Sequence, residues 1–428
     1  METIERAIER FRHWLLEFGY LSYDQFDFWG SRPGIFAKKL FYKNKILAAP
    51  LVILLQVLES FLPRSRALFA PKRRFAIGDA HFAMGYMNLY EYTNESGYLD
   101  AARELLAEMR SSATRTASGL GWGYPYTWVT SGGIYAPGTP FITVTPYAAE
   151  ASLRMHEITG EQHDLDMVAA SARFAAFDLK ETVVSPEETA AGYGTGDNRL
   201  VINANAYRAA LLLKAFQLFG ITEYKEKALK NLRYVLNWQQ PDGSWPYAED
   251  EPFIDNFHTC FVLKNLYKAY SVLKDDRPGS TGSTGSTGDG KTLAEEIMKA
   301  VKKGYEYYRR EMFRPDGTPV HFTKQTSPKF RKIEMYDYAE GISLGTLINQ
   351  DIPCALEFSA ELARHLIESF QLRDGHFVTR VTTFNTRNTV PYLRWPQAQL
   401  FYALTSLLLE SGPKAPGGEN GDTIVQRD

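Results

Sequence analysis

The chain has few cysteines and no cysteine–histidine cluster. Cys260 and Cys354 are its only cysteines among 428 residues, and neither belongs to a CxxC motif. A disulfide framework and a structural zinc site are therefore not expected. The N-terminus has no signal-peptide pattern. We predict a reduced, cytoplasmic setting, and we expect no metal and no cofactor.

The chain also lacks a dominant charge. It has 48 basic and 50 acidic residues, a net charge of −2, whereas proteins that bind nucleic acid usually present a basic face. We therefore expect no nucleic acid as a partner. The glycine-rich run at residues 192–196 has no preceding strand and no Walker lysine, so it does not predict a phosphate-binding loop.

No apolar run is long enough to span a membrane. Residues 46–55 are strongly apolar, but Gln56 and Glu59 follow them, and Pro63 comes soon after. Lysine and arginine flank this run over residues 39–74. Two interpretations stay open: peripheral docking of residues 39–74 on an anionic membrane surface, or an ordinary buried helix of an outer layer.

Helical periodicity dominates the rest of the chain. Apolar residues recur at i, i+3, i+4 and i+7, and the helices form pairs. Turns within a pair are short, as at 160–161, whereas loops between pairs are long and aromatic, as at 119–143. Because short and long connections alternate, all the long loops should lie at one end. We predict an all-α fold, an (α/α)6 toroid whose inner helices begin near residues 79, 145, 203, 255, 336 and 396.

The predicted toroid occupies residues 1–411 as a single domain. Residues 278–290 interrupt one helix pair with a run of glycine, serine and threonine, which is typical of a flexible insert. Residues 412–428 contain glycine, proline and lysine, and we predict a disordered tail there.

The starts of the inner helices should converge on one cavity, where their free N–H groups favour anionic ligands. Asp255 is explained as a helix N-cap. His258 lies one turn further on, and it is either a satisfied core residue or an acid/base group that works near neutral pH. Glu340 caps nothing. The predicted catalytic residues are Asp255, His258, Tyr338 and Glu340.

A second set of residues suits substrate binding. Asn203 and Asn205 are unfavourable in a helix rich in alanine and leucine; capping explains one, and the other should face a polar ligand. Arg394 could bind a carboxylate with two N–H groups. Loop aromatics either stack on sugar rings or pack the loops. The predicted substrate-binding residues are Asn203, Asn205, Asn256, Arg394, Trp122, Trp128, Trp245, Trp395 and Tyr193.

The turn at residues 238–245 (WQQPDGSW) resembles the QW repeat of terpenoid cyclases and protein prenyltransferase β subunits. Both families are α/α toroids, and the same Gln-x-x-Gly-x-Trp shape occurs among carbohydrate-active toroids. The resemblance implies the fold more than the chemistry.

The residue types at the helix starts resemble those of toroid polysaccharide lyases and glucuronyl C5-epimerases. Those enzymes use Asn or Arg to neutralise a uronate carboxylate and Tyr or His to move the C5 proton. Asn256, His258, Tyr338 and Arg394 fit these roles. The resemblance implies an enzyme that processes an acidic, uronate-containing polysaccharide by general acid/base chemistry, with an oligo- or polysaccharide as partner.

Three alternatives stay open. A glycoside hydrolase would use two carboxylates across the glycosidic bond, taken from Asp197, Asp255, Asp337 and Glu340. An isoprenoid cyclase or prenyltransferase-like protein would need an apolar pocket and a metal near Cys260. A non-catalytic glycan-binding protein would show binding without turnover.

Overall fold

The computed structural model describes residues 2–275, 289–325 and 330–412. Most of the predicted insert, residues 278–288, and nearly all of the predicted tail, residues 413–428, lie outside the described residues. Among the described residues, no helix is long and apolar enough to cross a membrane.

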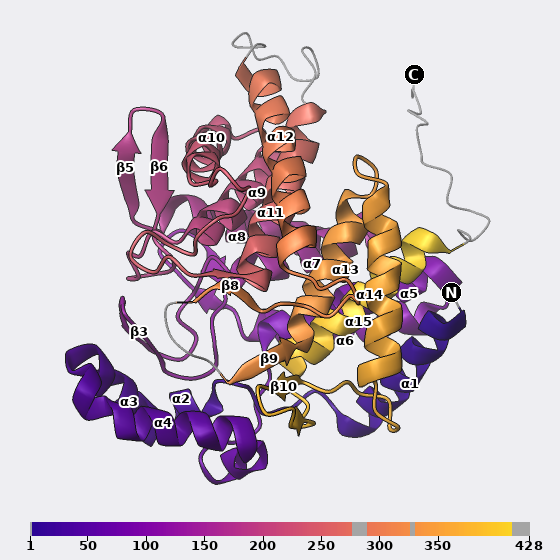
Figure 1. Cartoon of the computed structure of the whole chain (residues 1–428). Coiled ribbons are helices and arrows are strands. Elements are labelled where there is room, and N and C mark those ends of the chain that lie inside the picture. Colours follow the sequence, from indigo (N-terminus) through magenta and orange to yellow (C-terminus); the bar gives the residue numbers. More distant parts are fainter. Residues whose placement is uncertain (1, 276–288, 326–329, 413–428) are drawn as a thin grey trace.

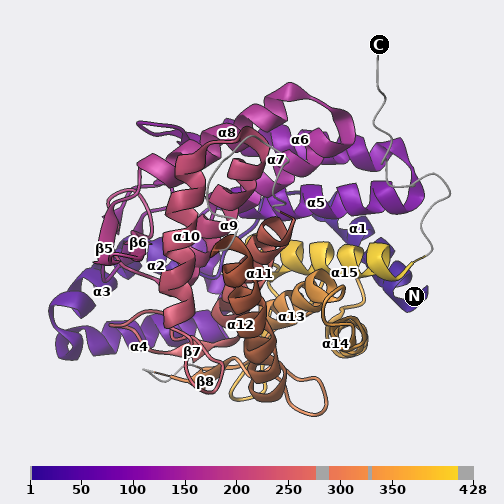
Figure 2. The same ribbon diagram turned by 90° about the horizontal axis from the view of Figure 1, so that it is seen from above.

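An inner ring of helices surrounds the centre of the molecule (Figure 2). Each inner helix contacts the next, and the last closes on the first. These helices are buried on nearly every side; in α5, for example, every residue from Ile77 to Leu89 is buried. The ring consists of α5 (Ala76–Thr93), α7 (Thr145–Thr159), α9 (Ile202–Phe219), α11 (Asn256–Lys274), α13 (Met335–Ile348) and α15 (Ala398–Ser411).

An outer layer of amphipathic helices packs around the ring and buries only its apolar face. In α1, for example, the buried residues Ile4, Ile8, Phe11 and Leu15 lie on one side. The helix α1 contacts both α14 and α15, so the N-terminal helix completes the layer as predicted. The (α/α)6 toroid is thus confirmed. The outer helices are α1 (Glu2–Phe18), α6 (Ser96–Ser111), α8 (Gln162–Phe177), α10 (Thr222–Asn237), α12 (Asp289–Glu311) and α14 (Cys354–Phe370).

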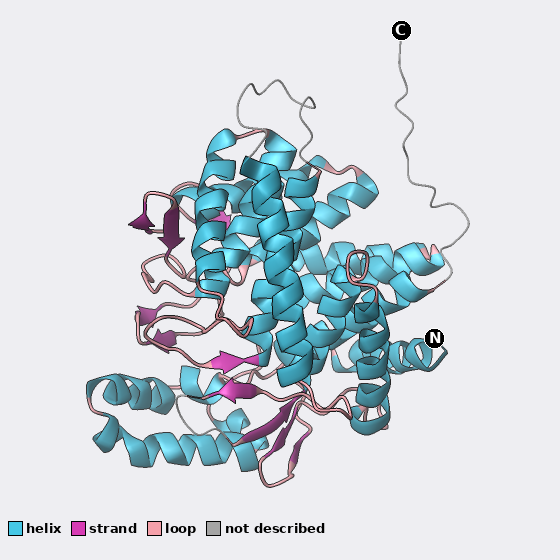
Figure 3. Cartoon of the chain, turned by 45° about the horizontal axis from the view of Figure 1, so that its top comes forward, coloured by secondary structure: helices cyan, strands magenta, loops and turns pink. Residues whose placement is uncertain are grey.

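The long loops carry short strands that gather on one side of the helical body (Figure 3). The pairs are antiparallel, and β9 and β11 flank β10 in a three-stranded sheet. The strand pair β7–β8 matters most, because it places the start of α11 against the loop after α12. The strands are β1 (Thr114–Arg115), β2 (Leu120–Gly121), β3 (Trp128–Thr130), β4 (Gly133–Tyr135), β5 (Glu181–Ser185), β6 (Glu188–Ala191), β7 (Ile254–Asp255), β8 (Phe322–Lys324), β9 (Arg331–Glu334), β10 (Arg380–Thr382) and β11 (Arg387–Asn388).

The QW-like turn links neighbouring outer helices. The amide of Gln239 donates to the carbonyls of Gly243 and, on α12, Ala300. Gly243 has φ +99°, and a Cβ there would lie 2.6 Å from the Lys303 carbonyl oxygen, so only glycine fits. A related turn follows α14, where Gln371 donates to its own turn and to Ala7 of α1. The turn therefore has a scaffold role.

Residues 27–68 form a helical hairpin beside the long loops (Figure 1). It comprises α2 (Asp27–Gly30), α3 (Arg32–Lys43), α4 (Lys45–Phe61) and the short 3-10 helix η1 (Pro63–Leu68). A small core of Phe28, Ala37 and Leu55 holds the hairpin together. The expectation of an ordinary buried outer helix is wrong, because an apolar face of α4 is exposed.

His81 on α5 is a buried histidine of the ring. Its Nδ1 lies 2.8 Å from the Ile77 carbonyl oxygen, and its ring packs against Tyr147. Burial lowers the pKa of His81 to about 4. The unfolded chain therefore binds a proton at His81 more tightly than the native state does. The native state thus loses stability as pH falls from the ordinary pKa of histidine towards 4.

We expect His81→Gln to lose less unfolding free energy on acidification than the unmodified protein does. A histidine with this shift contributes up to about 3 kcal/mol to the loss of unfolding free energy on acidification. Urea titrations near neutral pH and near the folded pKa of His81 would measure the difference. His163→Gln is the control, because His163 is half-exposed. An unchanged acid slope in His81→Gln would contradict the assignment.

Candidate functional site

Asp255 and His258 form a paired acid and imidazole at the start of α11. The Asp255 carboxylate accepts the backbone N–H of His258 at 3.0 Å and lies 2.8 Å from its Nδ1. Asp255 ends β7 and caps α11, so the first helical turn brings both the backbone N–H and the ring of His258 to its carboxylate. Asp255 is thus a helix cap, as predicted, and a partner of the imidazole as well.

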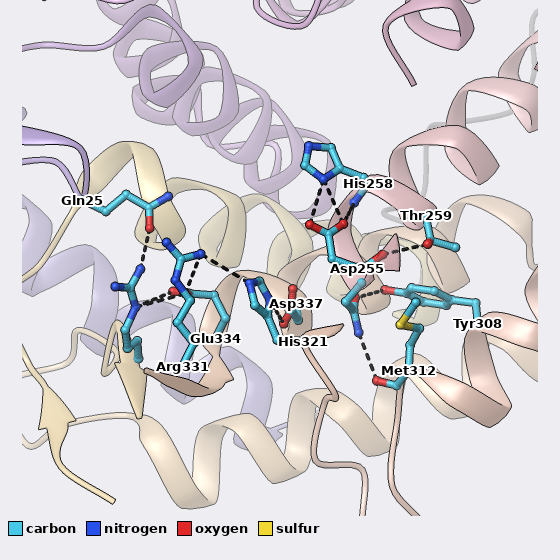
Figure 4. A network of polar contacts seen from close by, with 12 residues as sticks. Gln25, Asp255, His258, Thr259, Tyr308, Met312, His321, Arg331, Glu334 and Asp337 are labelled. Carbon is cyan, nitrogen blue, oxygen red and sulfur yellow. Dashed lines mark hydrogen bonds and ion pairs between the residues drawn. The ribbon is translucent and has the colours of Figure 1, made fainter. Parts of the chain in front are cut away.

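The pairing defines which nitrogen of His258 is available. Because Nδ1–H donates to Asp255, Nε2 of the neutral ring carries the lone pair. Nε2 lies on the side of the ring that faces away from the carboxylate (Figure 4), and the side chain is 19% exposed. The Asp255–His258 pair therefore has the geometry of an oriented general base.

Aromatic rings frame His258. The centroids of Phe257 and Tyr247 lie 4.1 and 4.7 Å from that of the imidazole, and Phe253 and Phe261 lie at 5.7 Å. These rings limit the rotation of the imidazole and lower the local dielectric constant, which strengthens its interaction with Asp255.

A second histidine–aspartate pair lies on the other side of Phe257. His321 Nδ1 is 2.7 Å from Asp337 Oδ2, and Arg331 Nη1 lies 3.3 Å from His321 Nε2. The Phe257 ring is 5.6 Å from that of His321. Burial, with the nearby charges of Glu334 and Asp255, raises the pKa of Asp337 well above its usual value.

His321 and Arg331 are not among the residues predicted from the sequence. Both lie in the loop after α12, whereas the predicted residues come mainly from the starts of the inner helices. No local pattern marks His321, because a non-local contact brings it beside the cap of α11: the backbone N–H of Asn256 donates to the His321 carbonyl at 3.0 Å.

Glu340 lies deeper in the ring and pairs with Lys264 of α11 at 2.6 Å. Burial by itself lowers the pKa of Lys264, but the Glu340 carboxylate raises it above its usual value. Glu340 therefore pairs with Lys264 rather than with His258.

A flat aromatic stack adjoins the His258 site. The rings of Tyr336 and Trp395 are parallel, with centroids 3.6 Å apart, and the edge of Phe257 meets Trp395 at 5.0 Å. Trp395 Nε1 and both amide atoms of Asn203 are buried without a hydrogen-bond partner in the described part of the chain. Because buried polar groups usually have partners, these atoms are available to a ligand, and the binding roles of Trp395 and Asn203 stay predictions.

Other predicted binding residues are engaged by the scaffold. Asn205 bonds to the backbone of Ala191 and Val201, and Asn256 donates to Met312 and accepts from Tyr308. Both amides are fully buried. Their hydrogen-bonding capacity is used within the protein, which corrects their assignment to substrate.

The buried tryptophans correct the prediction in the same way. Trp122 donates its Nε1–H to the Met109 carbonyl at 2.8 Å, and Trp245 donates to Val235 at 2.9 Å. Each ties a loop to the end of an outer helix. They pack the loops rather than offer a free face to a sugar ring.

Arg394 and Tyr338 also have structural partners. Arg394 donates two hydrogen bonds to the Asp24 carboxylate, at 2.7 and 2.8 Å, and is 3% exposed. The Tyr338 hydroxyl lies 2.9 Å from His365 Nδ1 on α14, so it points towards the outer layer. Neither is placed to act with His258.

Trp128 and Tyr193 lie in the long loops, where Trp128 is partly exposed and Tyr193 is buried. The Lys38 ammonium lies 4.4 Å from the centre of the Trp128 ring. Tyr193 accepts a hydrogen bond from Thr143 at 3.0 Å, and Arg199 lies over its ring at 4.9 Å. No contact between either ring and His258 is found among the described residues.

The predicted carboxylate and cysteine sites can also be placed. Asp197 is fully buried and pairs with Arg199 at 2.7 Å. Cys260 is fully buried, and its Sγ contacts the Glu340 carbonyl at 3.3 Å; burial raises the pKa of this thiol well above its usual value. Among the described residues, Cys260 does not belong to a group of His, Cys, Asp and Glu side chains close enough to hold a metal ion together.

The interior of the ring also holds a cavity of about 640 Å³ on the side of the short turns. Its wall includes Glu150 and Lys268, which pair at 2.7 Å, and Tyr147 and Tyr207, whose hydroxyls are hydrogen-bonded. This cavity lies at the opposite ends of the inner helices from His258, which is not among its lining residues.

The fold defines the protein as an α/α toroid. In comparisons with protein-family models and with curated proteins, none matches this chain.

Several solved structures are similar to it. A sugar epimerase from a ruminal bacterium has a TM-score of 0.59 at 12% identity, over 80% of this chain and 89% of that one. A family 88 glycosyl hydrolase from Bacteroides vulgatus has a TM-score of 0.53 at 10% identity, over 79% and 91%. A polysaccharide lyase has a TM-score of 0.52 at 13% identity, over 79% and 90%. At these identities the likeness establishes the fold.

Proposed function

We propose that this chain is a carbohydrate-active enzyme that processes an acidic, uronate-containing saccharide, with His258 as its general base. The observation that carries this proposal is the Asp255–His258 pair, held at 2.8 Å with Nε2 directed away from the carboxylate. The similar structures, which include a sugar epimerase and a polysaccharide lyase, support a saccharide as the substrate.

The chemistry begins with the proton at C5 of the uronate. Nε2 of His258 takes this proton, and the electron pair left on C5 delocalises into the carboxylate. Asp255 stabilises the imidazolium that forms. Departure of the substituent at C4 gives an unsaturated lyase product, whereas return of a proton to the opposite face of C5 gives the epimer.

Arg331 takes the role that the sequence suggested for Arg394. Glu334 lies 3.6 Å from Arg331 Nη1, but burial and the charge of Arg380 still lower the pKa of Arg331, so its cationic form would gain from a further anionic partner. A uronate carboxylate supplies that partner and can accept two N–H groups from guanidinium. Trp395, whose Nε1–H has no hydrogen-bond partner among the described residues, could donate to a hydroxyl of the saccharide.

A panel of uronate-containing and neutral saccharides tests the proposal. The ultraviolet absorbance of an unsaturated uronate reports a lyase, and deuterium uptake at C5 from heavy water reports an epimerase. Either result, confined to uronate substrates and lost in His258→Gln, is expected. Binding without turnover, or turnover of neutral glycans alone, would contradict the proposal.

A glycoside hydrolase is the second candidate, and one observation favours it. Burial raises the pKa of Asp337 well above its usual value, and Asp255 is close enough for its charge to add to the shift. A carboxyl of raised pKa close to a second carboxyl is the arrangement that glycosidases use. New reducing ends, without an unsaturated product or C5 exchange, would identify this chemistry.

A further inference from the structure

The α3–α4 hairpin lies in the most basic part of the chain. Residues 28–74 hold ten basic residues and one acidic residue, a net charge of +9, whereas the whole chain has −2. The remainder therefore carries −11. A charge separation of this size directs one face of a protein towards an anionic partner.

The outward face of α4 is a continuous apolar stripe. Its exposed residues recur at the spacing of one helix face. Ile46 and Leu47 at the tip are 85% and 66% exposed, and no charged residue occurs between Lys45 and Glu59. Isolated soluble chains rarely present so much contiguous apolar surface. The stripe consists of Ile46, Leu47, Pro50, Ile53, Leu54 and Val57.

Basic side chains border the tip of the stripe. Lys39, Lys43 and Lys45 are exposed, and none of them forms an ion pair with another residue that the structure describes. An apolar helix face bordered by lysines matches the boundary between lipid headgroups and acyl chains.

The hairpin is attached firmly to the long-loop end of the toroid. Trp29 donates to Glu59 at 3.0 Å, and Arg380 of β10 donates to the same carboxylate at 2.7 Å. Lys38 donates to the Val129 carbonyl of β3 at 2.9 Å. The hairpin therefore extends from the body as an anchored element beside β3 and β10 (Figure 1).

We propose that the α3–α4 hairpin docks this protein on the surface of an anionic phospholipid membrane. The helix α4 lies in the interface, with its apolar stripe towards the acyl chains and the lysines among the headgroups. A second copy of the chain is the less suitable occupant, because a symmetric contact would place the lysine clusters against each other. This inference does not depend on the reaction at His258.

Vesicle flotation with the full chain tests the proposal. We expect binding to vesicles of phosphatidylcholine mixed with phosphatidylglycerol, weaker binding to phosphatidylcholine alone, and a decrease as salt rises. Combining Lys39→Gln, Lys43→Gln and Lys45→Gln should weaken binding on the order of a hundredfold, since each lysine near an anionic surface contributes about fivefold.

The apolar contribution needs a matched pair of variants. Ile46→Glu with Leu47→Glu should abolish vesicle binding and keep the helical circular dichroism, because neither side chain is packed. Val183→Glu with Val184→Glu is the control: these valines on β5 are also 74% and 50% exposed but lie outside the hairpin. This control should bind vesicles as the unmodified chain does.

Two results would overturn the proposal. One is equal vesicle binding by the Ile46/Leu47 variant and the unmodified chain. The other is a stable dimer in light scattering that the Ile46/Leu47 variant dissociates, without vesicle binding by the unmodified chain, which would assign the stripe to a second copy.

Discussion

Replacing His258 by glutamine should lower turnover of the uronate substrate by about 10²–10⁴-fold, the usual contribution of a positioned general base. Glutamine can still donate a hydrogen bond to Asp255 but cannot take up a proton. The loss should therefore appear in kcat more than in KM. Initial rates on the substrate identified by the panel, together with circular dichroism, would measure the effect.

His163→Gln is the matched control. His163 lies in the first turn of the outer helix α8, as His258 lies in the first turn of α11, and it also has acidic neighbours, Glu161 and Asp164. Its substitution should leave turnover unchanged. Near-normal rates in His258→Gln would remove His258 from the catalytic machinery.

Asp255→Asn separates the two roles of that residue. Asparagine caps helices about as well as aspartate, so the unfolding free energy should change by less than about 0.5 kcal/mol. Turnover should still fall, because the amide cannot stabilise the imidazolium that forms in the reaction. Unchanged turnover in Asp255→Asn would show that Asp255 acts only as a cap.

The local part of the site could be predicted from the sequence, and the non-local part could not. Asp255 and His258 are three residues apart at a helix start, so helix geometry alone brings them together. By contrast, Arg394 and Asp24 are separated by 370 residues. Their pairing depends on how the N-terminal segment packs against the last loop, which no local pattern encodes.

The choice between Tyr336 and Tyr338 shows a second limit. Every residue of α13 from Met335 to Ile342 is buried, so the hydrophobic pattern does not indicate which side faces the centre of the ring. Two residues along a helix differ by about 200° in direction. Tyr336 consequently stacks on Trp395, whereas Tyr338 contacts His365 on the outer helix.

The alternation of connections was a stronger signal than any single motif. Short turns need neighbouring antiparallel helices, and long loops between pairs then lie at one end. The ring of helices can therefore be predicted from loop lengths and helical period alone. The exposed face of α4 was not settled in this way, because an apolar run of this length suits a buried helix as well as an interfacial one.

Replacing Arg380 by methionine should destabilise the protein by about 3–5 kcal/mol, the usual cost of removing one partner from a buried charge cluster. Arg380 is 2% exposed and donates to Glu334 at 3.0 Å, to Glu59 at 2.7 Å and to Gln25 at 2.6 Å. Its loss leaves two buried carboxylates without their main cation. Urea unfolding followed by tryptophan fluorescence would measure the change.

The deficit should depend on pH in a direction that identifies its cause. Burial alone would raise the pKa of Glu59, but Arg380 and Arg331 hold it below its usual value. This carboxylate therefore stabilises the native state above its unfolded pKa, and the contribution is lost as pH falls. Without Arg380 the carboxylate takes up a proton at higher pH, so the difference between variant and unmodified protein should shrink on acidification.

Two further variants distinguish charge from packing. Arg387→Met on the neighbouring strand β11 removes an exposed guanidinium, and its effect should stay within about 0.5 kcal/mol. Adding Glu59→Gln to Arg380→Met should recover part of the lost stability, because the orphaned charge is removed. If the double variant were as unstable as the single one at every pH, lost packing of the arginine side chain would be the cause. The attachment of the hairpin through Glu59 would then be less important than its contacts with Arg380 indicate.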